Sequence, residues 1–129
     1  MSAFSAILLL AEAATAQPNG FEYVRALYES AYTDDEVKFT SIIGNEFGFF
    51  AAPDFVVPMK FKEFKQFAQM CVSPKFISLN EAHKASGMTG VTVSAQCTPL
   101  SDKTSVERKF DFWEVNGKII AIRPTGMPE

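Results

Sequence analysis

The sequence has few of the residues that build metal and redox centres. It contains one histidine, His83, and two cysteines, Cys71 and Cys97, with no C-x-x-C spacing. A single histidine cannot build a multi-histidine metal site, and the cysteine spacing excludes a zinc ribbon and a thioredoxin-type motif. We therefore expect neither a metal nor a cofactor. The two cysteines could form a disulfide, although two buried reduced thiols are the simpler interpretation.

Positive charge is also scarce. Lys and Arg total 12 against 15 Asp and Glu, which gives a net charge of -3 and a pI near 5.2. Because no cluster of Lys and Arg occurs, the sequence lacks the basic surface of nucleic-acid-binding proteins and of proteins that bind anionic membranes. We expect neither nucleic acid nor a membrane as a partner.

The apolar run near the N-terminus, residues 6–11, is far too short to span a bilayer. Ala14–Ala16 has the small-x-small form of a signal-peptide cleavage site. However, no Lys or Arg precedes Arg25, and Glu12 follows the apolar run directly. We therefore expect residues 1–17 to form an extra N-terminal helix of a cytoplasmic protein, with a signal peptide as the alternative.

What the chain has in excess is phenylalanine. It holds 13 Phe but only 3 Tyr and 1 Trp, in a sequence that is 47% hydrophobic. This composition indicates a globular core, and 129 residues is the usual length of one domain, so we expect a single domain over residues 1–129. The Phe side chains are more than a small core needs. We expect some of them to line a cavity, the alternative being that they simply fill the core.

Apolar residues recur at three- and four-residue steps in two segments, and each segment predicts a helix with one apolar face. Between them, Thr33–Glu36 reads as an N-cap with an acidic first turn, which predicts a short helix ended by Gly44–Asn45. A strand is expected at Glu46–Ala52, where Pro53 stops it. The predicted helices are 21–32, 33–43 and 61–71, the last closed by Ser73 and Pro74.

From residue 75 onward the pattern is that of strands. Val91, Val93, Ala95 and Cys97 alternate with polar residues, which is the period of a half-buried strand. Asn116–Gly117 predicts a two-residue hairpin turn. Helices followed by hairpins predict an α+β fold, with three N-terminal helices on a curved antiparallel or mixed sheet that encloses an apolar pocket. The predicted strands are 76–85, 90–98, 105–115 and 118–123, with a turn at 101–104.

Asp111 is the most informative polar residue of the third of these strands. Alternation places Asp111 and Trp113 on one face, and Arg108, Phe110 and Phe112 on the other. If the face with Asp111 meets the helices, burial among aromatic rings would raise its pKa and keep it a neutral hydrogen-bond donor. The alternative is a solvent-facing Asp111 paired with a lysine.

Three further residues could carry chemistry. Tyr28 lies on the inner stripe of the first helix, where its phenol could meet a ligand or belong to the core. Asp54 could be a general base at the pocket mouth or a turn former, and His83 could be a base or a surface or dimer-interface histidine. The predicted substrate-binding set comprises Tyr32, Phe50, Phe64, Trp113 and Ile122.

The order of elements and the closing segment Phe110–Arg123 resemble the NTF2-like superfamily, and within it the SnoaL-like polyketide cyclases and ketosteroid isomerases. The resemblance covers about Phe21 to Arg123. It implies a conical fold with a deep apolar cavity, and a homodimer packed through the open face of the sheet. In the isomerases a Tyr of the first helix and a protonated Asp form an oxyanion hole. Tyr28 and Asp111 match these two positions, which implies that both face the pocket.

The sequence departs from the isomerases at the catalytic base. Their base is an Asp directly before a proline, and here that position is Ala52, with Asp54 on the other side of Pro53. An Asp–Arg–Asp arrangement like that of the limonene-epoxide hydrolases is not evident, because Arg108 and Asp111 point to opposite faces of their strand. Steroid-type isomerisation is therefore not expected.

The function expected from these residues is a cofactor-independent enzyme of secondary metabolism. It would be a cyclase, isomerase or dehydratase acting on a polyketide- or terpenoid-like substrate, with Asp111 and Tyr28 as hydrogen-bond donors and Asp54 or His83 as base. The alternative is a non-catalytic ligand-binding or dimerisation module of the same fold, which follows if Phe side chains fill the cavity. A secreted small-molecule carrier is a third possibility and depends on cleavage of residues 1–16.

Overall fold

A computed structural model describes residues 20–99 and 104–127. The predicted N-terminal segment 1–17 and most of the predicted turn at 101–104 lie outside the described residues. None of the helices within the described ranges is long and apolar enough to cross a membrane. The elements, in chain order, are α2 (Phe21–Tyr32), α3 (Glu36–Ile42), β1 (Ile43–Ala52), β2 (Phe55–Pro58), α4 (Phe61–Met70), β3 (Cys71–Asn80), the 3-10 turn η1 (Lys84–Ser86), β4 (Thr89–Cys97), β5 (Val106–Val115) and β6 (Lys118–Pro124).

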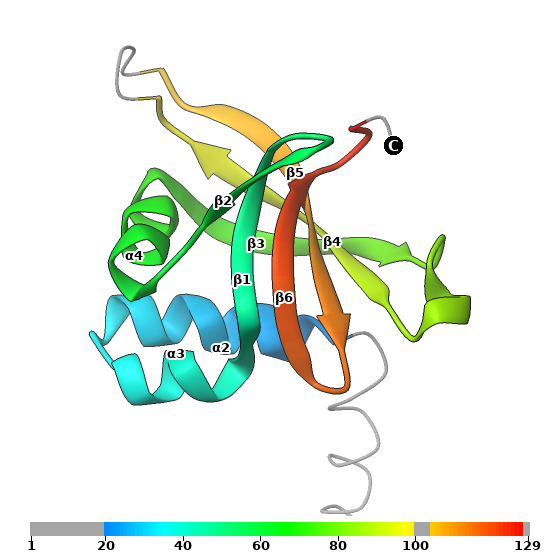
Figure 1. Cartoon of the computed structure of the whole chain (residues 1–129). Helices are drawn as coiled ribbons and strands as arrows, with labels where there is room; N and C mark the ends of the chain where they lie inside the picture. The colour runs from blue at the N-terminus through cyan, green and yellow to red at the C-terminus, as the bar shows by residue number, and fades with distance from the viewer. Residues whose placement is uncertain (1–19, 100–103, 128–129) are drawn as a thin grey trace, which may run out of the picture.

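The strands form one mixed sheet in the order β2-β1-β6-β5-β4-β3. Strands β3 to β6 are antiparallel neighbours, whereas β1 joins the far side of β6 in parallel and β2 pairs antiparallel with β1. The sheet twists strongly, and α2 and α3 lie together across one end of it, with α4 beside them (Figure 1). The predicted α+β fold, with three helices on a curved mixed sheet, is confirmed.

The helices cover one face of the sheet, which we call the inner face; the opposite side is the outer face. Apolar residues from both layers make one core. On β4 the inner residues are Val91 and Val93, and on β5 they are Phe110 and Phe112, all of which are buried. The α3 helix begins later than predicted, at Glu36, and its N-cap is Asp35 rather than Thr33, since the Asp35 side chain accepts a hydrogen bond from the Lys38 amide at 3.1 Å.

The third helix and the strand after it differ from the prediction. The helix ends at Met70, and β3 begins at once with Cys71, so Ser73 and Pro74 lie within a strand that was predicted only from residue 76. Ser73 has a φ of 55°, and the pairing register shifts between Val72 and Lys75, which identifies a bulge. Because β3 is an edge strand, it tolerates the missing N–H of proline. The short strand β2 was not predicted.

Cys71 and Cys97 form a disulfide. The two residues are direct partners in the antiparallel pairing of β3 and β4, and their Cα atoms lie 4.0 Å apart. The expectation of two reduced thiols is therefore wrong. Since β3 starts five residues earlier than predicted, the predicted strands did not place the two cysteines opposite each other.

Candidate functional site

The narrow end of the space between helices and sheet is filled with aromatic rings. The Phe64 ring is fully buried at its centre, with ring centroids of Tyr28 at 5.8 Å, Phe39 at 5.7 Å and Phe47 at 6.0 Å. The Phe67 ring extends this cluster, with its centroid 5.9 Å from that of Phe64. The deep apolar cavity implied by the resemblance is thus occupied at this end by the protein's own side chains.

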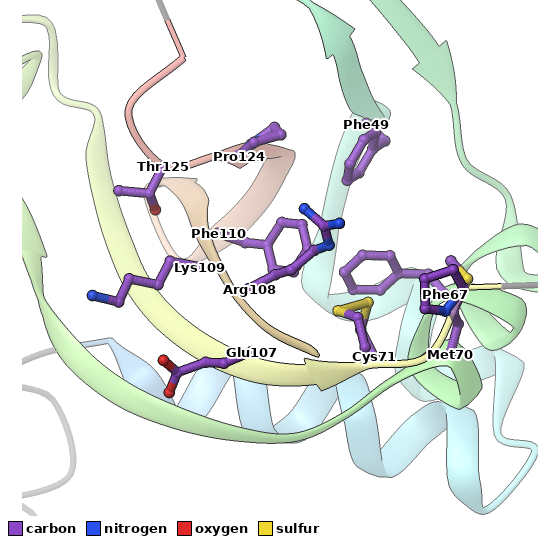
Figure 2. Close-up of a pocket in the computed structure, with 12 residues that line it drawn as sticks. Phe49, Phe67, Met70, Cys71, Glu107, Arg108, Lys109, Phe110, Pro124 and Thr125 are labelled. Carbon is purple, nitrogen blue, oxygen red and sulfur yellow. A yellow bond between two sulfur atoms is a disulfide. The ribbon is translucent and has the colours of Figure 1, made fainter. Parts of the chain in front are cut away.

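The wide end of the same space remains open as a cavity of about 640 Å³, which we call the mouth pocket (Figure 2). This volume lies within the range of about 300–1,000 Å³ that is usual for small-molecule sites. The cavity opens between the end of α4, β1, and the ends of β5 and β6. Its lining residues are Phe49, Phe67, Met70, Cys71, Cys97, Pro99, Glu107, Arg108, Lys109, Phe110, Pro124 and Thr125.

Three phenylalanine rings form the apolar wall of the mouth pocket. The Phe67 ring lies 5.3 Å from Phe110 and 5.9 Å from Phe49, and the Phe49 and Phe110 rings lie 6.1 Å apart. The Cys71–Cys97 disulfide lines the same cavity (Figure 2). These aromatic and sulfur surfaces favour an apolar ligand, because burying such a ligand against them removes apolar area from water.

The charged residues of the pocket lie on two sides of strand β5. Figure 2 shows the Arg108 guanidinium among Phe49, Phe67 and Phe110, whereas Glu107 and Lys109 point the other way. Glu107 accepts a hydrogen bond from the Ser94 hydroxyl at 2.7 Å. Alternation explains this division, since Arg108 shares the inner face with Phe110.

A second hollow, of about 1,100 Å³, lies where α3, β1, β2 and β6 approach one another. Four phenylalanines line it together with charged residues such as Glu36, Glu46 and Lys60. Both cavities therefore combine aromatic rings with charged side chains.

Tyr28 lies in the core rather than at a ligand site. Its hydroxyl donates a hydrogen bond to the carbonyl oxygen of Cys71 at 2.7 Å, and its ring packs edge-on against Phe64. Burial, together with the nearby Tyr32, raises the pKa of Tyr28. The phenol thus satisfies a backbone carbonyl at the start of β3.

Asp111 is buried on the outer face. Its neighbours Phe110 and Phe112 point inward and pack against Phe67, so alternation turns Asp111 away from the helices. The carboxylate accepts hydrogen bonds from Thr92 Oγ1 at 2.5 Å, Thr125 Oγ1 at 3.1 Å and Asn80 Nδ2 at 3.1 Å. It acts here as an acceptor and is neither a donor into the pocket nor solvent-exposed. The expectation that Tyr28 and Asp111 both face the pocket is wrong.

The other two predicted catalytic residues also lie outside the mouth pocket. Asp54 is exposed in the turn between β1 and β2, and the His83 ring packs edge-on against Trp113 at 5.3 Å. Trp113 is buried and shares the outer face with Asp111, so His83 and Trp113 both belong to that side of the sheet. The structure brings none of these side chains to the aromatic wall.

The predicted substrate-binding residues are spread over different parts of the fold. Phe64 and Ile122 are fully buried in the core. Phe50 lines the second hollow, where the Arg123 guanidinium lies 5.5 Å from its ring centroid. Tyr32 is 54% exposed, and its hydroxyl donates to the carbonyl of Ala68 at 3.2 Å. None of them, and not Trp113 either, lines the mouth pocket.

The residues that do line the pocket could have been found from one signal. Phe110 and Phe112 form the more apolar face of β5, which marks that face as the one toward the helices. Arg108 continues the same face toward the start of the strand, which places it at the open cavity between helices and sheet. Within the described residues, no group of three or more His, Cys, Asp or Glu side chains could hold a metal ion.

Comparison with solved structures identifies the fold of this chain. No family model matches this chain, and no curated protein matches its sequence. Among solved structures, a protein whose name begins Rd1NTF2 is similar over 79% of this chain and 92% of its own, with a TM-score of 0.51 and 16% identity. The chain has the NTF2-like fold.

Other similar structures are more distant. An NTF2-like protein of unknown function from Burkholderia pseudomallei matches 83% of this chain and 89% of its own, with a TM-score of 0.48 and 15% identity. A protein described as a SnoaL-like polyketide cyclase from Mesorhizobium loti matches 81% of this chain and 92% of its own, with a TM-score of 0.45 and 13% identity. At such identities the likeness concerns the fold and not the activity.

Proposed function

We propose that this chain is a small-molecule-binding domain whose ligand occupies the mouth pocket. The observation that carries the proposal is the three-ring wall of Phe49, Phe67 and Phe110 around a cavity of about 640 Å³. The centre of the space between helices and sheet is packed with aromatic side chains, so a ligand needs one of the open cavities. The three rings that face one another favour the mouth pocket over the second hollow.

Binding is favoured over acid–base catalysis by where the titratable groups lie. A cyclase, isomerase or dehydratase acting on a polyketide or terpenoid would need a proton donor and a base within hydrogen-bond reach of its substrate. Tyr28 donates to a backbone carbonyl in the core, and Asp111 accepts three hydrogen bonds on the outer face. Asp54 and His83 do not line the pocket. The non-catalytic ligand-binding module is therefore the better-supported alternative.

The disulfide adds an argument about location. Disulfides persist in oxidising compartments and are rare in the cytosol, so Cys71–Cys97 favours an oxidising compartment over the cytoplasm. A ligand-binding domain in such a compartment corresponds to a secreted small-molecule carrier. If the apolar segment before Gln17 is a signal peptide, the protein isolated from its native source should begin at Gln17; a retained Met1 would contradict this location.

Titration with the neutral dye N-phenyl-1-naphthylamine tests the proposed pocket, because its fluorescence rises on transfer to an apolar site. We expect saturable binding of one dye per chain with a dissociation constant on the order of 0.1 mM, from about 0.3 kcal/mol per non-hydrogen atom. Met70 lines the pocket and is 37% exposed, so Met70→Trp should fill the cavity without disturbing the core and weaken binding about tenfold.

The matched control is the preceding residue of α4. Gln69 is exposed and does not line the mouth pocket, so Gln69→Trp adds the same ring at a position where it should leave dye affinity unchanged. Absence of saturable binding to the unmodified protein, or equal weakening by both variants, would contradict the proposed site.

A further inference from the structure

The mouth pocket contains one cation at its aromatic wall. Arg108 lines the cavity together with Phe49, Phe67 and Phe110, and its guanidinium lies on the side of these rings (Figure 2). None of the described residues gives this guanidinium a hydrogen bond or an ion pair. Arg is always charged in proteins and carries five N–H donors, so its donors here face either solvent or a ligand.

The carboxylate nearest in sequence does not neutralise Arg108. Glu107 lies on the opposite side of β5, where it accepts the hydrogen bond from Ser94. Lys109, the other charged residue of the lining, has the same sign as Arg108. The open end of the pocket therefore combines a net positive charge with an apolar wall.

Arg108 is exposed when the pocket is empty, and a ligand that covers the guanidinium removes water from it, so an anion placed next to it restores the lost interactions. The planar guanidinium fork matches the two oxygens of a carboxylate, and such charge-assisted pairs are among the strong hydrogen bonds. A neutral apolar ligand would cover the guanidinium without giving its N–H groups a partner, which costs binding free energy.

We propose that the ligand of the mouth pocket is an amphipathic anion, with an apolar body against Phe49, Phe67 and Phe110 and a carboxylate-like head on Arg108. This inference rests on the proposed function and adds the chemical class of the ligand. It makes Arg108 the residue that sets specificity for the anionic group.

Competition against the bound neutral dye tests this inference with octanoate and 1-octanol, which have the same chain length and differ in the charge of the head group. The measured quantity is the ratio of the octanol inhibition constant to the octanoate inhibition constant. Arg108→Gln should lower this ratio about fivefold to tenfold, because the charged partner is lost at a partly solvated site. Added salt should weaken octanoate binding and leave octanol binding unchanged.

Lys75→Gln is the matched control, since it removes the same charge at an exposed position that does not line the mouth pocket. It should change the ratio less than about twofold. An unchanged ratio in Arg108→Gln, or an equal fall in Lys75→Gln, would overturn the assignment of Arg108 while leaving the pocket intact, because the neutral dye would still bind. If the dye does not bind the unmodified protein, the proposed function falls and this inference with it.

Discussion

Reduction of the Cys71–Cys97 disulfide should destabilise the protein by a predictable amount. The bond joins β3 to β4 at positions that are direct partners in the sheet, with a sequence separation of 26 residues. Reducing it leaves both sulfur atoms in the core, since the two cysteines are buried at 3% and 4% exposure. Reduction therefore opens a cross-link without creating a cavity.

The magnitude follows from the entropy of the unfolded chain. Closing a loop of this length restricts the unfolded state by about 3.5 kcal/mol at 25 °C in the chain-entropy description. For a domain of this size, a loss of about 3.5 kcal/mol corresponds to a fall in melting temperature of about 10 °C. The native contacts of the strand pair are unchanged in this estimate, so the whole effect is assigned to the cross-link.

Thermal unfolding with and without a reducing agent measures this difference, with circular dichroism as the readout. The double variant Cys71→Ala/Cys97→Ala is the control, because a reducing agent has no bond to break in it and its melting temperature should not change. Alkylation under denaturing conditions counts the free thiols of the unreduced protein, and we expect none. Two alkylated thiols before reduction, or a melting temperature that the reducing agent does not move, would refute the reasoning.

Three other substitutions test the placement of individual residues. Tyr28→Phe removes the donor to the Cys71 carbonyl and should cost about 1–3 kcal/mol in urea unfolding with dye affinity unchanged; lost dye binding at unchanged stability would contradict the core assignment. Asp111→Asn should likewise lower the free energy of unfolding by about 1–3 kcal/mol, because Thr92, Thr125 and Asn80 all donate to the carboxylate, and should leave dye affinity unchanged. The resemblance implies a homodimer, so light scattering should give twice the chain mass of 14.3 kDa, and Val56→Lys, at an outer-face position that is 41% exposed, should shift it toward the monomer; a monomeric unmodified protein would contradict the dimer.

Local patterns predicted most of the elements. The apolar spacing of the first helix matches α2, Phe21–Tyr32, and the alternation along residues 105–115 correctly separated Arg108 and Phe110 from Asp111. At the predicted hairpin, Asn116 and Gly117 have φ values of 52° and 80°, as a turn that needs two positive φ angles requires. These features depend on neighbouring residues alone, which explains why the sequence is enough to predict them.

Long-range pairing decided what the sequence did not predict. Alternation divides β5 into two faces, but the resemblance placed Asp111 on the wrong one, and only packing against the helices shows that Phe110 and Phe112 are inside. The disulfide depends on the β3–β4 register. Ser73 and Pro74, which predicted the end of a helix, instead lie within β3 at a bulge. The mouth pocket is what the aromatic cluster leaves open, so its lining follows from packing rather than from any motif.

The position of a bound ligand tests the central claim most directly. Nuclear Overhauser contacts between octanoate protons and assigned aromatic protons would locate the alkyl chain within the protein. We predict contacts to the rings of Phe49, Phe67 and Phe110, with the carboxylate end nearest the Arg108 side chain. Contacts to Phe50 in the second hollow, with none to the three-ring wall, would contradict the account.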